Sequence, residues 1–233
     1  MDIKTAEIFK KQIKLIDNKN VREIVEKFLN EAPEAFRIAP VKLYGKKTDP
    51  VFMKKGFYSK TKDKLIVGGL VKYVKETIKI AKYLMGNNLF SDIVLGMNIE
   101  NKMDDYHETL SIYKDAAIVT LLLCDTYKYN DNKGEELTNR FSHPLDAAKK
   151  LKEISDNYSD PYVTEICRLA HNAIERHEGK YCRSNKEPDI ILPMPQNGLD
   201  MFVNLVINMT FYNPNVGKSE KNEPNGRKKT EKS

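Results

Sequence analysis

The stretch DAAIVTLLLCDTY, residues 115–127, is apolar on every side of a helix between its two aspartates. A helix without a polar face belongs in the interior of a helical protein. The stretch is far too short to cross a bilayer, which takes roughly 20 apolar residues. It therefore predicts a buried central helix and an all-α fold.

Amphipathic segments flank this helix on both sides. Apolar residues recur at steps of three and four in each of them, as expected for one buried helix face. They cover residues 6–16, 21–29, 70–84, 147–154 and 163–177, and a last apolar helix is expected over residues 199–211. The chain from 32 to 69 carries Gly45, Pro50, Gly56 and many lysines with little apolar period. It predicts a long surface connection that adds no core layer, and no strand pair is expected.

The charge of the chain separates residues 1–212, expected to form one helical domain, from residues 213–233. This tail holds six Lys/Arg and three Glu, which is +3 of the formal net charge of +6. Its composition predicts a disordered basic tail. The domain itself is only mildly basic, so nucleic acid is expected to bind only weakly, through salt-sensitive contacts with the tail.

Targeting signals and cysteine spacing indicate the compartment. The sequence opens with Asp2, Lys4 and Glu7, without the basic and apolar regions of a signal peptide. Three cysteines without CxxC spacing argue against a disulfide framework and a zinc knuckle. We expect a cytoplasmic protein that does not interact with a membrane.

Asp125 is the most informative side chain, because a carboxylate at the end of an apolar helix is costly to bury without a compensating cation. Lys128, three residues on, can supply an ion pair. A divalent metal ion shared with His143 and His177 is the second solution. The residue pattern does not decide between the ion pair with Lys128 and the metal ion. Taken singly, a histidine in such a position is more often structural than a metal ligand.

Cys124 precedes Asp125 and could offer a thiolate to a metal. A buried cysteine usually behaves as a small apolar residue, and we expect this of Cys124. We expect His107 and His171 to be structural as well.

A series of short motifs in fixed order resembles the HD-domain superfamily of metal-dependent phosphohydrolases, in the type common in phages and Firmicutes. Each motif is weak alone, and the specificity lies in order and spacing. The resemblance covers residues 1–212. The motifs are APEAF at 32–36, GGLVKY at 68–73, CDTYK at 124–128, FSHPL at 141–145, HEG at 177–179 and LPMP at 192–195.

The resemblance implies that one metal site of that family has been dismantled. Tyr73, Cys124 and Ile207 stand where the family has two histidines and a late aspartate. Asp125 remains, and His143 and His177 match histidines that binuclear members use for a second metal. The resemblance thus implies at most one divalent ion, Mn, Fe, Ni or Zn, on Asp125, His143 and His177.

Two functions follow from the resemblance. The first is weak phosphohydrolase activity on a nucleotide-like phosphoester, with Asp125 as metal ligand and Lys128 as phosphate contact. The alternative is a pseudoenzyme that binds a nucleotide or a protein without turnover, using Lys128, Arg176 and Lys180. A phage-encoded protein of either kind would act in the host cytoplasm, and neither reading specifies an oligomeric state.

Overall fold

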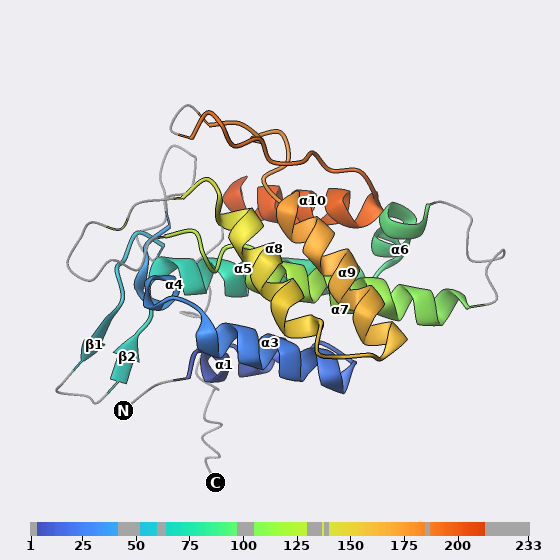
Figure 1. The fold of residues 1–233 in the computed structure, drawn as a ribbon, viewed down its shortest axis with the longest axis horizontal. Coiled ribbons are helices and arrows are strands. Elements are labelled where there is room, and N and C mark those ends of the chain that lie inside the picture. The colour runs from blue at the N-terminus through green and yellow to red at the C-terminus, as the bar shows by residue number, and fades with distance from the viewer. Residues whose placement is uncertain are drawn as a thin grey trace, which may run out of the picture.

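The computed structural model describes residues 4–41, 52–59, 64–96, 105–129, 137, 140–184 and 187–212. Within these residues ten helices and one two-stranded hairpin follow each other along the chain, which confirms the expected helical fold (Figure 1). The helices are α1 Thr5–Ile8, α2 Lys10–Ile13, α3 Lys19–Glu31, α4 Glu34–Ile38, α5 Gly69–Met85, α6 Asn88–Leu95, α7 Tyr106–Leu123, α8 His143–Ser155, α9 Pro161–Glu175 and α10 Gly198–Tyr212. The strands are β1 Phe57–Ser59 and β2 Lys64–Ile66.

Helix α7 is the centre of the bundle. It begins earlier than the apolar stretch, at Tyr106, and every residue from 115 to 123 is buried. Helices α5, α9 and α10 all pack against it, while α3 and α10 lie along opposite sides of the bundle (Figure 1). The buried central helix predicted from the sequence is confirmed.

Proline and capping residues fix where α8 and α9 begin. Pro144 and Pro161 each stand in the first turn, where a missing backbone N–H costs nothing. Asp160 caps α9 by accepting hydrogen bonds from the backbone N–H groups of Tyr162 and Val163. His143 is the first helical residue of α8, and Ser142 stands at the N-cap position before it.

The connection from 32 to 69 is more structured than expected. It contains α4, and its Phe36 and Phe52 lie in the hydrophobic core. The expectation that no strand pair forms is wrong, because β1 and β2 pair antiparallel with Phe57 opposite Ile66. Strands of three residues are too short to show the apolar alternation that would reveal them in a sequence.

Some of the sequence-based expectations concern residues outside the described part of the chain. The predicted disordered tail, 213–233, and Gly45 and Pro50 lie outside the described part of the chain. Helix α6 was not predicted. Among the described helices, none has the length and apolarity required to span a membrane.

A buried aspartate joins the N-terminal helices to α7. Asp115 accepts hydrogen bonds from the backbone N–H groups of Asp17, at 2.8 Å, and Asn18, at 2.9 Å. Burial raises the pKa of Asp115, and the two N–H donors oppose this shift. Asn18 in turn caps α3 by accepting from the N–H of Val21. One carboxylate of the central helix thereby sets where α3 starts.

We expect Asp115→Ala to lower the free energy of unfolding by about 1–3 kcal/mol, because it leaves two backbone donors without their acceptor. Urea unfolding followed by circular dichroism measures the loss. The exposed Asp92 on α6 provides the control, and Asp92→Ala should leave the midpoint almost unchanged. Equal stability of the two variants would contradict this role.

Candidate metal centre

Asp125 lies just beyond the end of α7, where the chain leaves the helix in a turn. Its side chain is only 5% exposed, and its Oδ1 lies 2.7 Å from Nζ of Lys128. Burial alone would raise the pKa of Asp125, but Lys128 and two neighbouring imidazoles hold it well below its ordinary value. The carboxylate is therefore ionised, and the ion pair anticipated as one solution is present.

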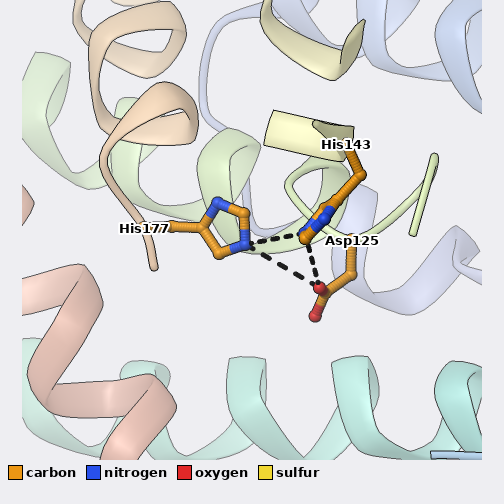
Figure 2. A group of neighbouring side chains, drawn as sticks. All are labelled: Asp125, His143 and His177. Atoms are coloured by element: carbon orange, nitrogen blue, oxygen red, sulfur yellow. Dashed lines mark hydrogen bonds and ion pairs between the residues drawn. The ribbon is translucent and has the colours of Figure 1, made fainter. Parts of the chain in front are cut away.

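His143 and His177 approach Asp125 from two other helices. His143 is the first residue of α8, and His177 follows the end of α9 by two residues. Their Nε2 atoms are 3.2 Å apart, and they lie 3.4 Å and 3.8 Å from Oδ1 of Asp125 (Figure 2). All three residues are buried, and their ligand atoms lie within 4.8 Å of one another. The three predicted metal ligands are thus brought together.

Backbone carbonyls determine which ring nitrogen of each histidine faces the cluster as an acceptor. Nδ1 of His143 lies 2.7 Å from the oxygen of Arg140, and Nδ1 of His177 lies 2.7 Å from the oxygen of Ile174. Since a carbonyl only accepts, both Nδ1 atoms must carry the proton. When both imidazoles are neutral, their Nε2 lone pairs point at each other and at Asp125. Metal-binding histidines commonly have this arrangement.

Glu178 adds a second carboxylate that sequence reasoning missed. Its Oε1 lies 3.5 Å from Nε2 of His143 and 3.6 Å from Nε2 of His177. With 24% of its side chain exposed, it borders the cluster on the more open side. Burial would raise the pKa of Glu178, but Lys128 and the imidazoles lower it. The only indication of this role in the sequence is that Glu178 directly follows His177.

A glycine turn directs Glu178 back toward the cluster. Gly179 has φ of +59°, in the left-handed region that favours glycine. A Cβ atom there would also collide with the side chain of Asn204. Asn204 of α10 donates to the backbone oxygen of Arg176 at 3.2 Å, which holds the turn against α10.

Several acceptors converge on this centre with one lysine as the nearby donor. Two Nε2 lone pairs face two carboxylates, an arrangement that repels unless a cation lies among them. The cation can be a proton or a metal ion. For His143, burial and the charge of Lys128 lower the pKa. For His177, burial also lowers the pKa, but Asp125 and Glu178 outweigh it and raise the pKa. Without a metal ion, the shared proton therefore belongs on His177.

The spacing of the acceptors fits a metal ion. Ligand atoms about 2.0–2.2 Å from a tetrahedral ion lie roughly 3.3–3.6 Å from one another. The three atoms of Asp125, His143 and His177 are separated by 3.2, 3.4 and 3.8 Å. The group can hold an ion with little rearrangement.

Tyr73, Cys124 and Ile207, which the resemblance to HD-domain proteins places at lost ligand positions, all lie in the core. Tyr73 is buried between the rings of Phe52 and Phe211, and Ile207 is buried on α10. Burial, reinforced by Asp125, raises the pKa of Cys124 well above its ordinary value, so its sulfur stays a thiol. Cys124 thus behaves as the small apolar residue that was expected.

The remaining candidates lie apart from the three ligands. Arg176 pairs with the buried Asp200 at 3.3 Å, so its charge is already matched. Lys180 is exposed, with Nζ 5.2 Å from the ring centroid of Tyr181. His171 lies 4.0 Å from Glu175 along α9, and His107 is exposed on α7.

Comparisons with protein-family models, with curated proteins and with solved structures give no match to this chain. The resemblance to HD-domain proteins therefore stays a prediction. The structure itself shows a mostly helical protein in which Asp125, His143 and His177 form a buried group able to hold a metal ion.

We expect Asp125→Ala and His143→Ala each to weaken binding of Zn²⁺ or Mn²⁺ at least roughly 100-fold, because disturbing only the support of a ligand already costs 10–100-fold. Calorimetric titration of chelator-treated protein measures the affinity. His171→Ala, a histidine of α9 outside the group, is the matched control and should bind as the unmodified protein does. Unchanged affinity in Asp125→Ala would rule out the site.

Metal binding should also release a proton, because a metal ion must displace the one held by His177. The raised pKa of His177 means that this proton persists to higher pH than in an ordinary histidine. Affinity should therefore rise with pH and level off above that pKa. Titrations at one pH below ~6.5, the ordinary histidine value, in buffers of different ionisation enthalpy should report about one proton per ion. Heats independent of buffer would contradict this protonation scheme.

Proposed function

We propose that this chain is an HD-superfamily phosphohydrolase homologue with a one-metal centre that acts weakly on nucleotide-like phosphoesters. The observation that carries the proposal is the convergence of the acceptor atoms of Asp125, His143 and His177 at ligand spacing. Two imidazoles and a carboxylate suit Mn, Fe, Ni or Zn. Residues 1–212 would form the single domain that supports this centre.

Charge at the centre supports an anionic ligand. Asp125 and Glu178 contribute two negative charges, and Lys128 contributes one positive charge. With a divalent ion added, the group carries a net charge of +1. Such a site attracts a phosphate group, and in its partly buried setting the attraction is stronger than in water. The ion, when bound, would activate water and neutralise charge that develops on the phosphoryl group.

Lys128 and Glu178 have the positions suited to the remaining steps. Lys128 holds Oδ1 of Asp125 at 2.7 Å with one N–H, which leaves two donors for a phosphate oxygen. Glu178 is the most exposed group of the cluster, and its lowered pKa keeps it ionised at neutral pH. We assign Glu178 as the base that accepts the proton of the attacking water. Asp125 orients the imidazoles and holds the ion.

A catalytically silent binding module is the second candidate, and the Asp125–Lys128 ion pair favours it. That pair already compensates the buried carboxylate, so the fold does not need a metal ion there. In this case a nucleotide would bind near Lys128 without turnover. Metal dependence of binding separates the two candidates.

We expect metal-loaded protein to hydrolyse bis(p-nitrophenyl) phosphate or nucleoside phosphates in a spectrophotometric and chromatographic screen. Asp125→Ala should abolish turnover. Glu178→Gln should retain the ion but lower kcat roughly 100-fold or more, within the range of a lost general base. Lys128→Ala should mainly raise KM.

His171→Ala is again the control and should turn over as the unmodified protein does. If no tested phosphoester is hydrolysed but nucleotides raise Tm, the silent module is supported and the enzyme proposal fails. Turnover that survives Asp125→Ala would show that it arises elsewhere.

A further inference from the structure

The β1–β2 hairpin has no part in the metal centre, yet it is built as a defined projection. In Figure 1 its two strands extend beyond the ends of the helices. Three residue pairs join the strands: Phe57 with Ile66, Tyr58 with Leu65 and Ser59 with Lys64. So short a ribbon is marginal without support from the rest of the protein.

Backbone contacts at its root provide that support. Gly56 N–H donates to the oxygen of Ile38 at 2.7 Å, and Gly68 N–H donates to the oxygen of Arg37 at 2.8 Å. A Cβ atom at Gly68 would collide with the backbone after α4, so the close approach requires glycine. Phe52, at the start of this segment, is buried in the core. The hairpin is therefore anchored at a fixed place on the bundle.

Large apolar side chains remain exposed on this anchored ribbon. Phe57 is 57% exposed and Ile66 is 37% exposed. They face each other across the two strands, so they lie on the same face and form one patch. Met53, 46% exposed, precedes the hairpin. An exposed phenylalanine on a rigid ribbon offers a flat ring to a partner.

Positive charge is concentrated in the same part of the sequence. Residues 42–64 contain eight lysines and two aspartates, a net charge of +6 that equals the formal charge of the whole chain. Among the described residues of this segment, Lys54, Lys55 and Lys64 are exposed, and none is acidic. Lys54 and Lys55 precede β1, and Lys64 is the first residue of β2, two residues before Ile66 and on the same face of the ribbon. The exposed lysines suit a polyanionic partner, and the exposed ring suits a partner with planar groups that can stack on it.

We propose that the hairpin binds single-stranded nucleic acid. Unpaired bases would stack on Phe57, and Lys54, Lys55 and Lys64 would contact the phosphates, which is the usual combination for single strands. An anionic membrane is the less suitable partner, because the sequence between the strands is Lys60-Thr61-Lys62-Asp63, whereas an inserting hairpin needs apolar residues there. This proposal does not depend on the metal centre.

Fluorescence anisotropy with a labelled 20-nucleotide oligothymidine tests the proposal on the full chain. We expect Phe57→Ala to weaken binding roughly 5- to 100-fold, the range for loss of one stacked base. The tail cannot mimic this effect, since residues 213–233 contain no aromatic residue. Replacing Lys54, Lys55 and Lys64 with alanine should reduce the slope of log affinity against log salt by about 2. Phe57 is exposed, so its loss should leave Tm unchanged.

An exposed tyrosine on α5 with neighbouring lysines supplies a matched control. Tyr83 is 78% exposed on α5 and lines a shallow surface depression with Lys79 and Lys82. Tyr83→Ala and the Lys79, Lys82 double alanine variant should bind the oligonucleotide as the unmodified protein does. If the hairpin variants and the α5 variants lost affinity for the oligonucleotide equally, the binding would reflect the overall positive charge of the protein, and the proposal would be overturned. So would binding to vesicles of anionic lipid without binding to the oligonucleotide.

Discussion

Burial of the Asp125 carboxylate at the end of an apolar helix constrains everything around it. An ionised carboxylate in such a place is costly unless opposite charge or donors surround it. Lys128 supplies one compensating charge from the same turn. The imidazoles of His143 and His177 come from the start of α8 and from beyond the end of α9, so both helices must place an end at this point. The meeting of three helix ends explains why Asp125, His143 and His177 lie together at one place in the interior.

The two buried aspartates of the α7 region are satisfied in different ways, and the difference separates structure from chemistry. Asp115 receives two backbone N–H donors that no ligand can replace, and burial raises its pKa. Asp125 is surrounded by lysine and imidazole, which lower its pKa against the effect of burial. Backbone donors fix a fold permanently, whereas the proton on an imidazole can exchange for a metal ion. Of the two carboxylates, only that of Asp125 is therefore placed to bind a metal ion.

The sequence predicted these features unequally, for physical reasons. The all-apolar stretch around Leu121 predicted the central helix because a helix with no polar face has one place to lie. Asp125, His143 and His177 could be named because each is a costly polar residue beside an apolar run. Glu178 could not, because its approach depends on the left-handed turn at Gly179, and acidic residues are common on surfaces. The hairpin at Phe57 was missed since its stability comes from backbone contacts with the end of α4, which leave no local pattern.

Charge at the centre couples ligand affinity to occupancy by a metal ion. When no ion is bound and His177 is protonated, the positive charges of Lys128 and His177 balance those of Asp125 and Glu178, and the group is neutral. Exchange of the proton for a divalent ion changes the net charge to +1. The three candidate ligands are all buried, and the low dielectric of a buried site strengthens any such difference in charge. A centre of this kind would bind phosphate poorly until an ion is present, because the fold itself supplies no excess positive charge there.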